Sequence, residues 1–209
     1  MTHTLHREGS LEELSKDYVV IAMPAAGVNT EGSGQKLKRF LQIAKKYNPI
    51  NTGDSKAGNQ LSFGTIDKLS EAVFDAGICH AVFDNPTNLT HFLNEVKSEN
   101  MGISITVSGL FDEIGKCCKE IGATPHTINM SVGIYGQVEK LPPDEIREVT
   151  TMCGHSMVTA KMVTDAVEKI RKGGDPVKLA TKMAEPCICG VFNITRAARL
   201  LKRMADADL

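Results

Sequence analysis

Apolar and polar residues form blocks along the first 136 residues, and each block has the length of one strand or one helix. An apolar, β-branched run at residues 17–24 predicts a buried strand, and a glycine-rich turn separates it from a helical pattern at residues 36–47. Residues 48–64 are polar and show neither a helical nor a strand period. We therefore expect a long loop there.

Between residues 65 and 136, helical and strand patterns alternate. Helices are predicted at residues 65–77, 86–100 and 110–122, and strands at residues 79–84, 102–108 and 126–136. Strands and helices that alternate in this way are typical of βαβ units, whose strands run parallel. We predict an α/β fold with a mostly parallel sheet built from βαβ units, followed by an α-helical C-terminal portion.

The C-terminal portion is recognised by a change of pattern after Gly136. Two prolines and two acidic residues at residues 142–145 are typical of the start of a helix, and three further helical patterns follow before the end of the chain. No strand pattern occurs after this point. We divide the chain into an α/β domain of residues 1–136 and an α-helical portion of residues 137–209.

Charge and composition exclude two classes of partner. The formal net charge is −1, so the chain lacks the basic excess that binds nucleic acid or an anionic membrane surface. It has no run of about 18 apolar residues that could span a bilayer, and its first residues lack the pattern of a secretory signal. We expect a cytoplasmic protein with no nucleic-acid or membrane partner, which could form a homo-oligomer.

Cysteines carry the strongest chemical signal in the chain. Six are present, and in a reducing compartment they would serve metal ligation or thiol chemistry rather than disulfides. Cys153 lies beside His155 in the sequence MCGH, and Cys187 and Cys189 form the sequence CICG. Both motifs precede predicted helices, whose first N–H groups and dipole would stabilise a thiolate.

Three thiolates suit two kinds of metal centre. A [4Fe-4S] cluster on Cys153, Cys187 and Cys189 would leave one iron open to a substrate hydroxyl or carboxylate. Zinc would need a fourth ligand, either His155 or one cysteine of the pair at residues 117–118. The alternative without an ion is that these cysteines are small buried core residues.

Polar residues near the predicted strand ends are candidates for substrate binding. Ligands of open parallel sheets bind at the carboxyl ends of the strands, where Ser108 lies. Asn129 and Ser131 share one face of the strand predicted at residues 126–136. Lys36 follows the glycine-rich loop, which could bind an anion at a helix start, although a flexible turn explains the glycines equally well.

These observations lead to one main hypothesis and two alternatives. We predict an iron–sulfur enzyme of the lyase, dehydratase or sulfur-transfer type, in anaerobic metabolism or cofactor biosynthesis, acting on a small anionic metabolite. His155 and Arg196 would be its catalytic residues. The first alternative is a non-catalytic binding or assembly protein in which zinc only holds the helical C-terminal portion to the sheet. The second is a metal-free enzyme that uses a cysteine nucleophile.

Overall fold

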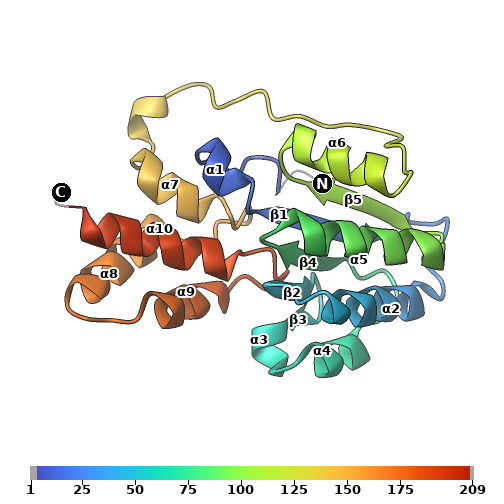
Figure 1. Cartoon of the computed structure of the whole chain (residues 1–209). Coiled ribbons are helices and arrows are strands. Elements are labelled where there is room, and N and C mark those ends of the chain that lie inside the picture. Colours follow the sequence, from blue (N-terminus) through green and yellow to red (C-terminus); the bar gives the residue numbers. More distant parts are fainter. Residues whose placement is uncertain (1–3, 208–209) are drawn as a thin grey trace.

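A single five-stranded sheet lies at the centre of the protein in a computed structural model that describes residues 4–207 (Figure 1). The strand order is β3-β2-β4-β1-β5, and every pair of neighbours runs antiparallel. The strands are β1 (Tyr18–Met23), β2 (Asn51–Asp54), β3 (Gly58–Asn59), β4 (Cys79–Phe83) and β5 (Ser104–Ser108).

Helices make up most of the remaining regular structure. Those before residue 136 are α1 (Leu11–Leu14), α2 (Ser33–Lys46), α3 (Gln60–Phe63), α4 (Ile66–Ala72), α5 (Pro86–Glu99) and α6 (Phe111–Glu120). Those after it are the 3-10 turn η1 (Val138–Lys140), α7 (Asp144–Thr150), α8 (Ala160–Arg171), α9 (Pro176–Ala184) and α10 (Ile194–Asp206). None of the helices in residues 4–207 is long and apolar enough to cross a membrane.

The predicted parallel sheet is wrong, and the reason lies in which strands are neighbours. Strands β4 and β5, which α5 connects, both run antiparallel to β1 and are therefore parallel to each other, but β1 lies between them. In the same way β1 and β2 are connected through α2, and β4 lies between them. Each of these two helical crossovers thus passes over one strand of the sheet. The strand that lies between the two connected strands runs in the opposite direction to both, so neighbouring strands are antiparallel.

Two local predictions also differ from the structure. Residues 48–64, expected to be a loop, contain β2, β3 and α3. Residues 126–136, expected to be a strand, are irregular and join α6 to α7 (Figure 1). The alternating apolar side chains of this segment are exposed, so they meet no hydrophobic core. They are Ile128, Met130, Val132 and Ile134.

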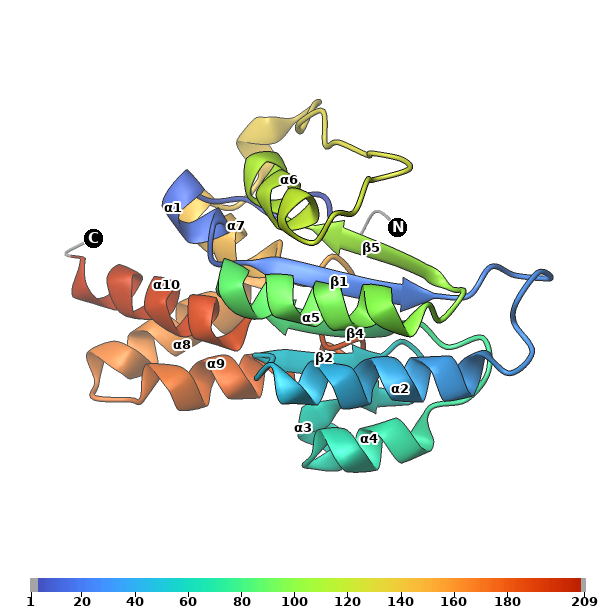
Figure 2. The same ribbon diagram turned by 45° about the vertical axis from the view of Figure 1, so that its right-hand side comes forward.

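The two faces of the sheet belong to two hydrophobic cores. On one face Val20 and Ala22 of β1 pack with residues of α2, α5 and α6, and Figure 2 shows α2 and α5 lying along the sheet. On the other face Val19 and Ile21 of β1 join Val82 of β4 in a core with α7 to α10. The helices after residue 136 therefore share a core with the sheet.

The loop between α9 and α10 lies directly on β2, and two glycines allow this contact. A Cβ atom on Gly53 would lie 2.5 Å from the carbonyl carbon of Cys189. Gly190 has a positive φ of 69°, which favours glycine, and a Cβ atom there would collide with the backbone of Thr52. Backbone thus packs on backbone at this point, and the C-x-C motif is held against the sheet.

Replacing Gly53 by alanine should therefore destabilise the protein by about 1–3 kcal/mol, the usual cost of overpacking a filled interior. Gly115→Ala is the matched control, because Gly115 is in α6 and a Cβ atom there would meet nothing within 4 Å. That change should stabilise the helix by up to about 1 kcal/mol. Urea unfolding of both variants measures the difference, and equal effects would contradict the close contact at Gly53.

Candidate metal centre

The structure brings the two cysteine motifs together. Cys153 follows α7, and Cys187 and Cys189 lie between α9 and α10, yet all three side chains belong to one core. The sulfurs of Cys187 and Cys189 are 3.9 Å apart, and Nδ1 of His155 lies 3.7 Å from the sulfur of Cys189. The thiol of Cys153 lies close enough to that of Cys187 for the two to shift each other's pKa. Three sulfurs and one imidazole therefore form a continuous group.

This group lies at the border between the core and solvent. The cysteine residues are almost fully buried, with exposed fractions of 2% for Cys153, 1% for Cys187 and 4% for Cys189. His155, by contrast, is exposed. The thiols are thus shielded from bulk water, and the imidazole lies on the solvent side of the group.

Buried side chains from the N-terminal half hold both cysteine loops. Asn59 Nδ2 donates hydrogen bonds to the carbonyl oxygens of Ala184, Glu185 and Cys187, at 3.0–3.3 Å. Arg7 donates to the carbonyl oxygens of Met152, beside Cys153, and of Val191. Nothing in the local sequence of Asn59 or Arg7 indicates these distant carbonyl partners, so neither role could be predicted from the sequence.

The thiols differ in acidity because they form a chain of hydrogen bonds. The bond from Cys187 lowers the pKa of Cys189 against the effect of burial, and the backbone N–H of Val191 assists. The pKa of Cys187 rises to about 12: the bond from Cys153 lowers it, but the bond to Cys189 and burial together outweigh that effect. The pKa of Cys153 is raised by its bond to Cys187 and by burial. Cys189 is thus the only one of the three thiols whose pKa is lowered.

The backbone donors to these sulfurs come from the loops themselves. Helix α8 begins at Ala160 and α10 begins at Ile194, several residues after the cysteines. The expectation that helix starts stabilise the thiolates is therefore wrong. N–H groups of the turns perform this role, from His155 and Met157 toward Cys153 and from Val191 toward Cys187 and Cys189.

The two separations of 3.9 and 3.7 Å are close to those between ligands of one tetrahedral ion. Metal–sulfur bonds of about 2.3 Å place two sulfurs about 3.8 Å apart, and a nitrogen ligand about 3.6 Å from a sulfur. The side chains here contact one another directly, however, and among residues 4–207 no group of three or more His, Cys, Asp or Glu is arranged so that it could hold a metal ion. Binding an ion would thus replace thiol protons and require small side-chain rotations.

The other cysteines lie away from this group. Cys79 and Cys117 belong to the core on the opposite face of the sheet, and Cys118 lines a cavity beside α6. Neither cysteine of the pair at residues 117–118 is therefore placed to be the fourth ligand. His155 occupies that position.

Arg196 is not placed to meet a substrate. Its side chain is fully buried at the start of α10, where it forms an ion pair of 2.7 Å with Asp17 and donates to the carbonyl oxygen of Glu8. Asn193 also donates to Asp17, at 3.0 Å. The arginine predicted to be catalytic thus occupies the position of a structural ion pair.

Lys36 lies on the side of the sheet opposite the thiols, in the first turn of α2. The N–H groups expected to bind a substrate anion there already bind a carboxylate of the protein. Gly32 and Gly34 donate to the two oxygens of Asp75, at 2.9 and 2.6 Å. These bonds lower the pKa of Asp75. The anion site predicted from the glycine-rich loop is therefore occupied by Asp75.

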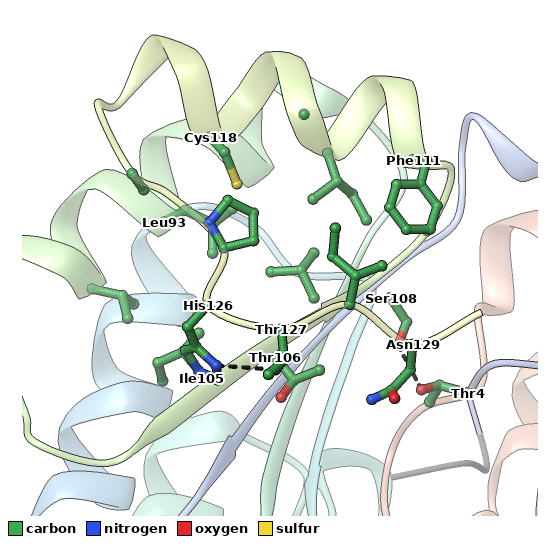
Figure 3. A pocket seen from close by; sticks show the side chains of 18 of the residues that line it. Thr4, Leu93, Ile105, Thr106, Ser108, Phe111, Cys118, His126, Thr127 and Asn129 are labelled. Carbon is green, nitrogen blue, oxygen red and sulfur yellow. Dashed lines mark hydrogen bonds between the residues drawn. The ribbon is translucent and has the colours of Figure 1, made fainter.

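Ser108, Asn129 and Ser131 line one common cavity, but the three thiols do not line it. Figure 3 shows Ser108 and Asn129 at the same end of this cavity, near Thr4. The hydroxyl of Ser131 is hydrogen-bonded to His6, at 2.9 Å. Three of the four predicted substrate residues thus line the same cavity, beside the edge strand β5.

His80 is a candidate that sequence reasoning missed. It is paired with Gly53 across β2 and β4, so its side chain points to the face on which the loop of Cys189 lies. It is buried, with 1% exposed. In the predicted parallel sheet, His80 would lie near the start of its strand, away from a site at the carboxyl ends of the strands, but this argument fails in an antiparallel sheet.

Comparison with known proteins supplies no relative from which a function could be transferred. No family model, curated protein or solved structure matches the chain. The function is therefore argued from the site.

Proposed function

We propose that the protein binds one thiophilic metal ion, with zinc as the best candidate, through Cys153, Cys187, Cys189 and His155. The observation that carries the proposal is the meeting of two distant loops with separations of 3.9 Å between sulfurs and 3.7 Å between sulfur and nitrogen. Loop N–H groups directed at the sulfurs favour thiolates, which are the form that binds metal. The soft donor set selects zinc among the common divalent ions.

A single ion is favoured over the [4Fe-4S] cluster predicted from the sequence. In a cubane cluster each cysteine binds a different iron, so the ligand sulfurs are separated by the cluster itself. Here Cys187 and Cys189 are within contact distance of each other. We infer that a cluster would need a larger rearrangement of the two loops than a single ion would.

The exposed His155 bears on whether the site is structural or catalytic. Catalytic zinc keeps three protein ligands and one exchangeable position, whereas structural zinc is closed by four protein ligands. Three buried cysteines with one exposed imidazole allow either form. A small anionic metabolite that displaced His155 would bind the ion directly, and lyase or sulfur-transfer chemistry at that position stays a prediction. The site requires reduced cysteines, which fits the proposed cytoplasmic location.

A second candidate function is metal-free thiol chemistry at Cys189. The specific observation is that the pKa of Cys189 is lowered while those of Cys153 and Cys187 are raised. His155 at 3.7 Å could then act as the general base or stabilise the thiolate. In this case Cys189 would react with electrophiles without any ion.

Metal analysis of protein purified without oxygen or chelator tests the proposal. We expect one zinc per chain and no acid-labile sulfide. Iron and sulfide in equal amounts would overturn the single-ion proposal in favour of a cluster. Protein that neither contains nor takes up zinc, but in which iodoacetamide alkylates Cys189 rapidly, would overturn it in favour of thiol chemistry.

A further inference from the structure

A cavity of about 880 Å³ lies at the edge of the sheet beside β5, apart from the thiol group. Helix α6 forms one side, and the irregular segment at residues 123–131 forms another (Figure 3). Phe111 and Cys118 point from α6 toward the cavity, and His126, Thr127 and Asn129 lie along the segment. The volume is within the range of about 300–1,000 Å³ that is usual for small-molecule sites.

Most of the cavity wall is aliphatic. Lys97 of α5 and Thr106 of β5 also line it, but most of the side chains from α5, β5 and the region of α6 that face it are aliphatic. They include Leu93, Val96, Ile105, Val107, Ile114 and Ile121. A ligand with a long apolar body would gain most in this part, because burial of apolar surface is the main attraction there.

One end of the cavity is polar. Thr4 and Ser108 form a hydrogen bond of 2.6 Å, and Asn129 lies beside them (Figure 3). Arg7 also lines the cavity, and its side chain is 94% buried, with 6% exposed. Its Nε–H has no hydrogen-bond partner among the described residues. A buried donor on a cationic group without a partner is costly, so this donor marks a position that an acceptor would stabilise.

Arg7 shares its carboxylate partner with a second arginine. Among residues 4–207, Asp17 is the only carboxylate that pairs with Arg7, and it also pairs with Arg196. Glu8, the next acidic residue in the chain, pairs with Arg147 instead. Two buried guanidinium groups thus share one carboxylate, Asp17, which itself lines the cavity beside Arg7.

We propose that this cavity binds an amphipathic molecule with a long unbranched apolar chain and a carboxylate head, that is, a fatty acid or a close relative. The chain would lie among the aliphatic residues of β5, α5 and α6. The carboxylate would accept hydrogen bonds from the hydroxyls of Thr4 and Ser108 and from Arg7. None of the three thiols lines this cavity, although Arg7 contacts both the cavity and the loops that carry the thiols.

A displacement assay on the full chain tests the proposal. The probe is undecanoic acid with a terminal dansyl group, whose emission increases in an apolar site, and the competitors are dodecanoate and dodecanol. We expect the acid to displace the probe at a concentration lower by about tenfold or more, which is the effect of one charge-assisted hydrogen bond. No displacement by either competitor would overturn the proposal, and equal displacement would overturn the assignment of a carboxylate head.

Two neighbouring variants on α6 locate the binding site. Cys118→Phe should fill the cavity and weaken probe binding by about tenfold or more, because overpacking leaves no room for the chain. Lys119→Phe adds the same side chain at an exposed position that does not line the cavity, so it should bind the probe like the original protein. Unchanged binding by Cys118→Phe would overturn this location.

A third variant separates this inference from the metal proposal. Cys153→Ser removes a proposed metal ligand, and it should bind the probe normally while losing the metal. Loss of both properties together would show that the cavity is not an independent site.

Discussion

Replacing Asp17 by asparagine should destabilise the folded protein by about 3–5 kcal/mol, the cost of breaking a buried ion pair by removing one partner. The carboxylate is fully buried and receives hydrogen bonds from Arg7, Arg196 and Asn193. Asparagine would leave both guanidinium groups buried without a counter-charge. The free energy of unfolding from urea titration measures the effect.

A surface ion pair supplies the control for this prediction. Glu12 pairs with Lys16 at 3.1 Å, but the carboxylate side chain is 80% exposed. Glu12→Gln should therefore change the free energy of unfolding by about 1 kcal/mol or less. Equal effects of the two substitutions would show that the cluster around Asp17 does not hold the N-terminal segment to α10.

The same cluster should make stability depend on pH. Burial alone would raise the pKa of Asp17, but the charges of Arg7 and Arg196 and the hydrogen bonds from Arg7 and Asn193 outweigh it and lower the pKa. A carboxyl with a lowered pKa contributes stability above its unfolded pKa of about 4 and loses it as the pH falls through the folded pKa. The stability difference between the original protein and Asp17→Asn should therefore shrink below about pH 4. A difference that stays constant down to pH 2 would contradict this.

Replacing Cys189 by serine should produce the second large effect, the loss of zinc binding. Loss of an outer-shell partner usually lowers metal affinity about 10–100-fold, and loss of a thiolate ligand should exceed this. Cys153→Ser and Cys187→Ser should act similarly. Competition with a chromophoric chelator measures the zinc affinity of each variant.

Cys79→Ser is the matched control for the ligand series. Cys79 is also fully buried, and its thiol is hydrogen-bonded to Asp54 at 3.7 Å, but it lies in the core on the opposite face of the sheet. The same atomic replacement there should leave zinc affinity unchanged. If Cys79→Ser lost zinc while Cys189→Ser retained it, the ligand assignment would be wrong.

The sequence predicted the local elements better than their arrangement. The apolar run of β1 and the helical patterns of α2 and α5 are strong local signals, and the structure contains these elements. The alternation of strands and helices also predicts that two strands joined by a helix run in the same direction. It does not determine which strand lies between them, because that choice depends on packing across the whole sheet. The antiparallel sheet therefore could not be deduced from the order of elements.

The candidate site was predictable only where residue type alone carried the signal. Cysteines beside a histidine stand out in a sequence, and the structure brings Cys153, Cys187, Cys189 and His155 together. Arg196 was predicted to be catalytic, but the structure buries it. Its partner Asp17 is 179 residues away in the chain, and no local pattern indicates such a pair. Distant partners explain why its burial was missed.

X-ray absorption at the zinc edge of the zinc-loaded protein tests the central claim most directly. If Cys153, Cys187, Cys189 and His155 bind one ion, the first shell should contain three sulfurs at about 2.3 Å and one nitrogen at about 2.0–2.1 Å. A first shell of oxygen and nitrogen alone, with no sulfur at about 2.3 Å, would contradict the claim that these thiols form the metal site.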